Sequence, residues 1–292
     1  MRQNKWLVLI GVEFYMDGNA RLSHFSSLEG PIHDLESVRE FFADKVGIDN
    51  DHILILKSTN PERASVDTDV NSIPKNEPME RDRSEWPTYE NILKVLDKVT
   101  TSAERGDLVY VYYSGHGGRA TTTFPQKKGV RGVDETLVPL DVNCGGRYVR
   151  DFEIAALIHK MIQQKGLHVT LIFDSCHSGG ATKDQKPNGM VARGSSNLNV
   201  QILPTDTSDL SEEDLIAACQ AGAMDPSTSE TSFWLQPKGY VLLAACLPSQ
   251  VAYEVDFLQV KRGVFTHWLV DSLRGAAAEN QLAKLTHEAL HR

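Results

Sequence analysis

The apolar residues of this chain gather in short runs that recur along the sequence. Runs rich in Val, Ile, Leu and Tyr occupy 6–12, 52–56, 107–113, 168–173 and 239–245, and polar or glycine-containing segments bound each of them. Continuous apolar runs of this length are typical of strands that a parallel sheet buries on both faces. The pattern therefore predicts buried strands of a largely parallel sheet.

Helical periodicity fills the segments between these runs. Apolar residues recur every three or four positions in 33–46, 88–100 and 151–163, which predicts one amphipathic helix in each. Strands that alternate with helices favour an α/β fold, a doubly wound three-layer sandwich. In such sheets ligands bind beyond the carboxyl ends of the strands, so we look for a site there.

Two polar stretches interrupt this alternation. Residues 57–87 contain four prolines and many charges and are expected to form a surface loop, and residues 181–232 form a second polar linker. No repeat or compositional break marks a second domain. We expect one domain over 1–292. The linker at 181–232 divides it into a larger part, residues 1–180, and a smaller part, residues 233–292, which stops within an amphipathic pattern.

Charge and cysteine content narrow the functional classes. Thirty basic and thirty-nine acidic residues give a net charge of -9 without a dense basic tract, which argues against nucleic-acid binding. The four cysteines form no Cys-x-x-Cys pair, so a zinc site or a disulfide framework is not indicated, and a reduced compartment, the cytoplasm, is expected. No apolar run is long enough for a membrane span, and we expect a monomer.

Two of the expected strands end in glycine-rich segments that carry reactive side chains. Tyr-Ser-Gly-His-Gly at 113–117 places His116 just beyond one strand, and Asp-Ser-Cys-His-Ser-Gly at 174–179 places Cys176 just beyond another. A thiol attacks a peptide carbonyl only as the thiolate, so a catalytic cysteine needs a base beside it. Because neighbouring strands lie about 4.8 Å apart, residues beyond their ends can form a Cys-His dyad.

The same geometry suggests an oxyanion hole. The backbone N–H groups of Cys176 and Gly117 are the expected donors to a developing oxyanion, at roughly 3 kcal/mol each. An inert core thiol is the alternative for Cys176. Ser175, Ser178 and His177 are rival catalysts, but no Gly-x-Ser-x-Gly elbow surrounds either serine.

A carboxylate next to this chemistry predicts the specificity. Side chains two apart on a strand point the same way, so Asp174 shares a side with Cys176 and Ser114 shares one with His116. Two opposite unit charges 4 Å apart attract by roughly 4 kcal/mol at an effective dielectric constant of 20. A basic side chain before the scissile bond is therefore favoured.

The paired motifs at 113–117 and 174–179 resemble those of the metacaspases, within the caspase-like cysteine peptidases. The resemblance follows the chain in order, from the strand at 7–11 through Asp-Glu-Thr-Leu-Val-Pro-Leu-Asp at 134–141 to Gly-Val-Phe-Thr-His-Trp-Leu at 263–269. It implies a caspase-like sandwich with a six-stranded sheet, His116 and Cys176 as the dyad, and Asp34 and Ser114 in the substrate pocket with Asp174. Alternatively, Asp34 is simply an acidic residue in the first turn of a helix, where the helix dipole stabilises its charge.

The resemblance also implies calcium and self-cleavage. No cofactor is needed for the chemistry, but many metacaspases require calcium, and Asp134, Asp151 and Asp184 are the nearest match to its ligands. Arg150 stands where the family commonly has an adjoining aspartate, and Lys183 precedes Asp184, the only nearby carboxylate. Calcium binds six to eight oxygens with no cation among them. Family members cleave themselves in the segment after the cysteine; Lys183, Lys186 and Arg193 are candidates, or simply basic residues of a solvated loop.

These observations predict a cysteine endopeptidase that hydrolyses peptide bonds after Arg or Lys through a thioester acyl-enzyme. Its partners would be proteins or peptides with basic residues, and neither nucleic acid nor membrane. The alternative is a catalytically silent caspase-like module that binds partners in signalling. Loss of the cysteine or histidine would mark that module, and this sequence retains both.

Overall fold

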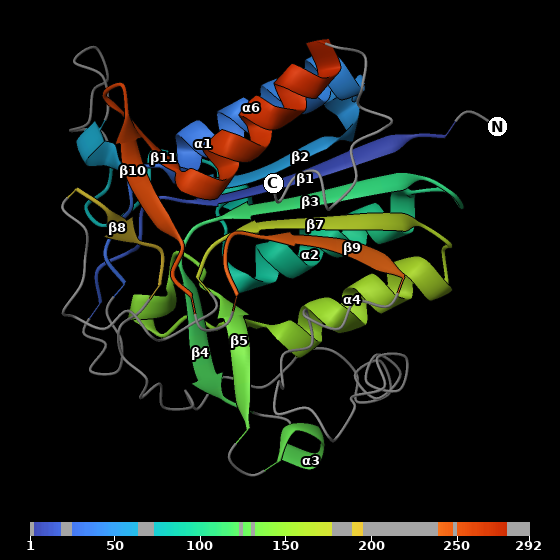
Figure 1. The fold of residues 1–292 in the computed structure, drawn as a ribbon. Helices are drawn as coiled ribbons and strands as arrows, with labels where there is room; N and C mark the ends of the chain where they lie inside the picture. Colours follow the sequence, from blue (N-terminus) through green and yellow to red (C-terminus); the bar gives the residue numbers. More distant parts are fainter. Residues whose placement is uncertain are drawn as a thin grey trace.

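A central parallel sheet organises the structure, a computed structural model that describes residues 3–18, 25–63, 73–122, 125–129, 132–176, 189–194, 239–247 and 250–278. The sheet has the strand order β2-β1-β3-β7-β9, and each neighbouring pair is parallel. Its strands are β1 (Lys5–Val12), β2 (Ile53–Ser58), β3 (Leu108–Ser114), β7 (His168–Asp174) and β9 (Tyr240–Ala244). All carboxyl ends therefore meet at one edge (Figure 1).

Four helices cover the two faces of this sheet. Helices α1 (Pro31–Phe41) and α6 (Val264–Ala278) lie on one face, and α2 (Tyr89–Ser102) and α4 (Asp151–Gln163) lie on the other (Figure 1). Strand β1 shows why both faces are buried: Leu7 and Leu9 pack into the cluster with α1, while Val8 packs into the cluster with α2 and α4. The expected three-layer α/β architecture is confirmed.

The regular elements agree well with the apolar pattern. All five runs form strands, and the helix expected over 151–163 has these bounds. The Thr88 side chain accepts a hydrogen bond from Asn91 N and so caps the start of α2. The described part of the chain contains five strands in the central sheet, one fewer than the family resemblance implied.

The helix expected over 33–46 is continuous but changes its winding. After α1 the backbone forms a π-helix, Phe42–Val46, and ends at Gly47, which has a φ of 72°. A left-handed residue is the common way to stop a helix, and glycine adopts it without a Cβ clash. Four short 3-10 helices complete the described helical segments: Asn50–His52, Pro61–Arg63, Arg83–Glu85 and Val142–Cys144.

Two small antiparallel sheets, which the apolar pattern did not predict, border the carboxyl edge. One contains β4 (Gly117–Thr121), β5 (Val133–Leu137) and β6 (Val149–Arg150), with helix α3 (Pro125–Lys128) near its hairpin tip. The other contains β8 (Val191–Ala192), β10 (Tyr253–Phe257) and β11 (Val260–Gly263). These strands are short and mix polar with apolar residues, so continuous apolar runs could not reveal them.

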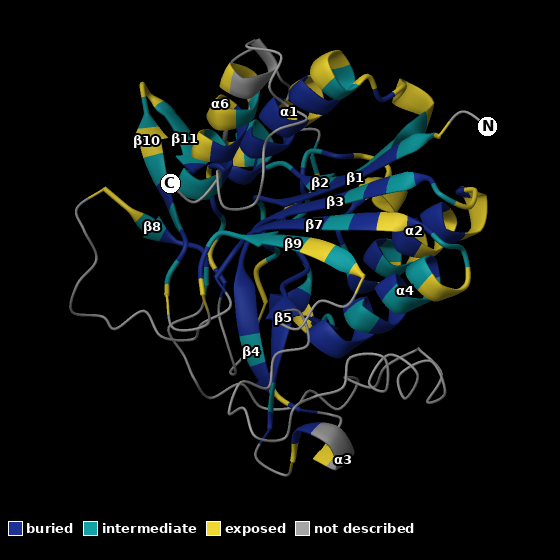
Figure 2. Ribbon diagram, turned by 45° about the vertical axis from the view of Figure 1, so that its right-hand side comes forward, coloured by how far each residue is buried: buried dark blue, intermediate teal, exposed yellow. Residues whose placement is uncertain are grey.

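Burial follows this layout. The carboxyl halves of β1, β3 and β7 are buried, whereas β9 exposes part of its length at the edge of the sheet (Figure 2). The polar stretch 57–87 is not a surface loop throughout, because it begins inside β2 and buries Trp86. Within the described residues, no helix is long and apolar enough to cross a membrane.

Candidate functional site

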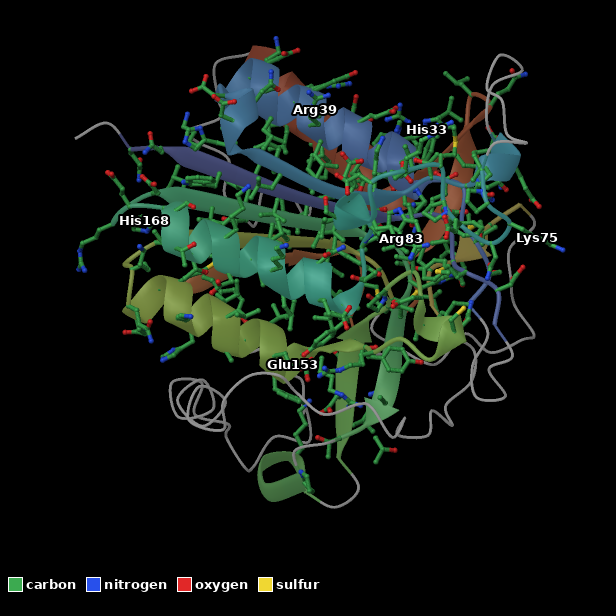
Figure 3. The ribbon with its side chains drawn as sticks, turned by 180° about the vertical axis from the view of Figure 1, so that it is seen from behind. His33, Arg39, Lys75, Arg83, Glu153 and His168 are labelled. Atoms are coloured by element: carbon green, nitrogen blue, oxygen red, sulfur yellow. The ribbon has the colours of Figure 1, made fainter. Side chains whose placement is uncertain are left out.

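The strand register brings the two glycine-rich motifs to the same level. Ser114, the last residue of β3, pairs with Asp174, the last residue of β7, and Gly11 of β1 pairs with Ser114 from the other side. His116 and Cys176 therefore leave adjacent strands at the same edge. Figure 3 shows the two ends of the molecule from behind: His168 marks the amino end of β7, and His33 on α1 lies toward the carboxyl edge.

Cys176 is buried against a second thiol. Its Sγ accepts a hydrogen bond from Ala252 N at 3.0 Å and lies 3.2 Å from Ala252 O, and the residue packs in one cluster with Cys246 and Ala252. The hydrogen bond with Cys246, and then burial, raise the pKa of the Cys176 thiol far above its usual range. In this arrangement the sulfur is a protonated thiol.

His116 is held in one tautomer by a backbone carbonyl. Its Nε2 lies 2.9 Å from Ser26 O, which can only accept a hydrogen bond, so the proton is on Nε2 and the lone pair is on Nδ1. Nδ1 is buried and has no hydrogen-bond partner among the described residues. Burial lowers the pKa of His116 to about 4, and the rings of Tyr15 and Phe25 pack beside it. The imidazole is therefore neutral at pH 7.

Arg193 does not lie in a solvated loop, one of the two alternatives for it, because it is fully buried, and its backbone lies against both motifs. Its carbonyl oxygen accepts hydrogen bonds from Cys176 N at 2.9 Å and from Gly117 N at 3.0 Å. These are the two N–H groups expected to form the oxyanion hole.

The segment around Arg193 is extended, as a bound peptide would be. Ala192 and Val191 pair antiparallel with β10, and Arg193 N donates to Ala252 O at 3.0 Å. The next residue, Gly194, is so close to the thiol that a Cβ there would lie 2.7 Å from Cys176 Cβ and 3.3 Å from Sγ. The Arg193–Gly194 peptide bond therefore lies beside the sulfur with its carbonyl between two donors.

The Arg193 guanidinium fills a pocket of three carboxylates. It lies 2.7 Å from Asp34, 3.2 Å from Asp174 and 3.5 Å from Glu254, and it donates to Ser114 Oγ at 2.8 Å. Burial alone would lower the pKa of Arg193, but the three carboxylates raise it well above its usual range. Asp34, Ser114 and Asp174, expected in this pocket, are thus brought together around one basic side chain.

Backbone N–H groups from distant segments orient the carboxylates. Asp34 accepts from Gly263 N at 3.1 Å, Asp174 accepts from Thr266 N at 3.0 Å, and Glu254 accepts from Gly30 N at 3.1 Å. Burial raises the pKa of Asp34 from 3.8 to about 6, although Arg193 lowers it, and the neighbouring Asp174 raises it further. Asp34 therefore carries a negative charge in the pocket at an energetic cost.

Sequence reasoning missed Glu254 and Ser26. Glu254 belongs to a short strand without a motif, and Ser26 contributes only its backbone carbonyl, so no local signal identifies either. His177, Ser178, Lys183, Asp184 and Lys186 lie outside the described residues.

The described residues expected to bind calcium do not fit a calcium ion. Asp134 and Asp151 do lie together, but the Lys128 ammonium lies between them, 2.9 Å from Asp134 and 2.6 Å from Asp151. Arg150 binds the other oxygen of Asp134 at 2.5 Å. Calcium requires an oxygen cage of six to eight ligands, and two cations already use these carboxylates.

Comparison with known proteins identifies the family of the chain. The family model of the metacaspase, peptidase C14 domain matches residues 5–184, more than half of the chain. The chain belongs to the metacaspase family. It is 28% identical over 181 residues to Metacaspase-1 of Mycosarcoma maydis, covering 62% of this chain and 37% of that protein. It is 30% identical over 164 residues to Metacaspase-4 of Arabidopsis thaliana, covering 55% and 32%.

The chain spans about a third of the length of these curated metacaspases. A Geobacter sulfurreducens protein of known crystal structure shares the fold, with a TM-score of 0.55 and 16% identity over 97% of this chain and 90% of that one. That likeness concerns the fold alone. Recognition of the chain as a metacaspase is confirmed by the family match.

Proposed function

We propose that this metacaspase chain is a cysteine endopeptidase that cuts after Arg or Lys, with Cys176 as the nucleophile and His116 as the base. One observation carries the proposal: Arg193 fills the carboxylate pocket while its own carbonyl accepts hydrogen bonds from Cys176 N and Gly117 N. These contacts support the proposal that Arg193 occupies the position of the substrate residue before the scissile bond.

The proposed reaction uses the lone pair of His116 Nδ1 and the two N–H groups that contact the Arg193 carbonyl. His116 Nδ1 takes the proton of the Cys176 thiol, and the sulfur attacks the carbonyl carbon of the residue in the pocket. The oxyanion that forms is stabilised by the N–H groups of Cys176 and Gly117, each worth roughly 3 kcal/mol. His116 then gives the proton to the leaving amine, and a thioester remains on Cys176. Water hydrolyses this thioester with His116 again as the base.

The first substrate would be the chain itself. Attack on the carbonyl of Arg193 breaks the Arg193–Gly194 bond, makes Arg193 a new carboxyl terminus and gives Gly194 a free amine. While the bond is intact, Arg193 occupies the pocket and excludes other substrates. Cleavage would allow the segment to leave, so the intact chain is a zymogen in this proposal.

Charge favours Arg and Lys over all other residues in this pocket. Three carboxylates surround the guanidinium, so an acidic side chain would meet only repulsion, and a neutral one would leave buried charges without a partner. The planar guanidinium can reach Asp34, Asp174 and Ser114 at once, whereas an ammonium contacts fewer of them. We expect Arg substrates to be cleaved faster than Lys substrates.

Fluorogenic peptides test the proposal. Peptides that end in Arg, Lys or Asp are incubated with the purified chain, with Cys176→Ala and with His116→Ala. Cleavage after Arg and Lys that both substitutions abolish would support it. Cleavage after Asp would refute the pocket assignment, and a folded chain that cleaves neither itself nor any peptide would instead support the silent binding module.

A further inference from the structure

A buried lysine lies in the middle of a cage of oxygen atoms below the active site. Lys128 Nζ lies 2.7 Å and 2.6 Å from the two carboxylate oxygens of Asp151, 2.9 Å from Asp134 Oδ1 and 3.1 Å from the carbonyl oxygen of Val133. The side chains of Lys128, Asp134 and Asp151 are all fully buried. One bidentate carboxylate, a second carboxylate and a carbonyl are the types of ligand that hard divalent cations bind.

Among the described residues, the charges of this cluster balance without a metal. Arg150 Nη1 donates to the other oxygen of Asp134 at 2.5 Å and to Thr121 O at 3.0 Å. Two carboxylates from this part of the chain thus face two basic side chains. A divalent ion placed among them would add two positive charges next to a buried ammonium and a buried guanidinium, and it would have to displace Lys128 to reach its ligands.

The cluster connects the hairpin of the oxyanion hole to helix α4. Asp134 is on β5, where it pairs with Ala120 of β4, and β4 begins at Gly117. Asp151 is the first residue of α4, and its Oδ1 also accepts from Phe152 N. Figure 3 shows Glu153 in the same first turn of α4, beside the base of this hairpin. Whatever cation binds Asp134 and Asp151 therefore fixes the position of Gly117.

We propose that Lys128 is a built-in cation that takes the place of a calcium ion between Asp134 and Asp151, so that this chain holds its β4–β5 hairpin in place without calcium. The proposal departs from the calcium requirement that the family resemblance implied. It goes beyond the proposed peptidase function, because its main test measures the fold and does not depend on proteolysis.

Thermal unfolding provides that test, on a Cys176→Ala background that prevents self-cleavage. The melting temperature of this chain is measured in EGTA and in 5 mM CaCl2, together with the Lys128→Ser variant. We expect the parent to differ by less than 1 °C between the two buffers. Loss of one partner from a buried ion cluster should lower the melting temperature of Lys128→Ser in EGTA by about 5 to 15 °C. Calcium should restore at least half of that loss.

Two controls make the result specific. Lys160→Ser removes a half-exposed lysine of α4 that lies 3.5 Å from Asp97, and it should change the melting temperature little and give no calcium response. MgCl2 should rescue Lys128→Ser less than calcium does, because magnesium requires a tighter octahedral cage.

The proposal is overturned if calcium raises the melting temperature of the parent by several degrees, or if Lys128→Ser is destabilised but does not respond to calcium. Should Lys128→Ser fail to fold, calorimetric titration of the parent with CaCl2 still decides: no heat of binding at millimolar calcium is expected, and saturable binding would contradict the proposal. In the chain with an intact Cys176, peptide cleavage in EGTA should stay within twofold of that in calcium. If the chain cleaves no peptide, the proposed function fails, but the unfolding measurements still test the role of Lys128.

Discussion

Replacing Asp34 with asparagine separates a substrate-binding role from a structural one. Asp34 lies 2.7 Å from the Arg193 guanidinium, where the direct attraction of unit charges is roughly 6 kcal/mol at an effective dielectric constant of 20. Yet burial raises the pKa of Asp34 to about 6, about two pH units above its ordinary 3.8. At pH 7 its charge therefore costs about 3 kcal/mol of folding stability.

Asp34→Asn keeps the size and most hydrogen bonds but removes this charge. We expect the free energy of unfolding at pH 7 to rise by about 1 to 3 kcal/mol. The raised pKa of Asp34 means that its protonation stabilises the folded state below pH 3.8, and that this stabilisation is lost as pH rises through about 6. The stability gained by Asp34→Asn should therefore vanish near pH 4. For Arg peptides, loss of one buried ion-pair partner should lower kcat/KM by about a hundredfold.

The assay combines urea unfolding at pH 4 and pH 7, on the Cys176→Ala background, with kcat/KM for an Arg peptide in the active chain. A matched control is Asp82→Asn, because Asp82 is an exposed residue whose side chain caps a short 3-10 helix. If Asp34→Asn lost stability at pH 7 while it retained activity, Asp34 would be a structural partner of Arg193 and the reasoning above would be wrong.

Three further predictions follow from single contacts. In Gly117→Ala the new Cβ would lie 1.6 Å from Cys176 O, so the rates of self-cleavage and peptide cleavage should fall by at least a thousandfold. Progress curves measure these rates, after circular dichroism has shown that the variant is folded. Acid should lower kcat/KM for Arg peptides, because burial raises the pKa of Asp34 and its protonation removes charge from the pocket; a flat profile from pH 7 to pH 5 would contradict this. Met190, three residues before Arg193, lines an apolar cavity of about 380 Å³ together with Trp268. A Met-Val-Ala-Arg peptide should therefore have a KM roughly tenfold below that of Gly-Val-Ala-Arg. Trp268→Ala should remove this difference in KM.

The sequence predicts the parts of this fold that depend on local pattern. The five central strands form where the continuous apolar runs lie, and the helices α1, α2 and α4 form where the apolar residues recur every three or four positions. The strands β8, β10 and β11 escape prediction because they are short and mix polar with apolar residues. The pairing of β8 with β10 also depends on contacts between segments more than fifty residues apart.

The site divides in the same way. His116, Cys176 and Asp174 could be found because each follows or ends a buried strand, and a parallel register then brings them to one edge. Glu254 and the Ser26 carbonyl reach the site only through tertiary packing. The burial of Arg193 could not be read from a polar segment, since its partners come from three distant parts of the chain.

Lys128 illustrates the limit for metal sites. The sequence identified Asp134 and Asp151 as candidate ligands, and the structure places them together. It also places a lysine from the neighbouring short helix between them, and no spacing rule connects that residue to either aspartate.

The position of self-cleavage is the most direct test of the central claim, that Arg193–Gly194 lies in the active site as a bound substrate. The purified chain is incubated at pH 7.5, and its fragments are identified by intact mass and N-terminal sequencing. We predict one early cut that creates an N-terminus at Gly194, and no such cut in Cys176→Ala or in Arg193→Gln. A first cut at another bond, or an active peptidase whose Arg193–Gly194 bond stays intact, would contradict the account.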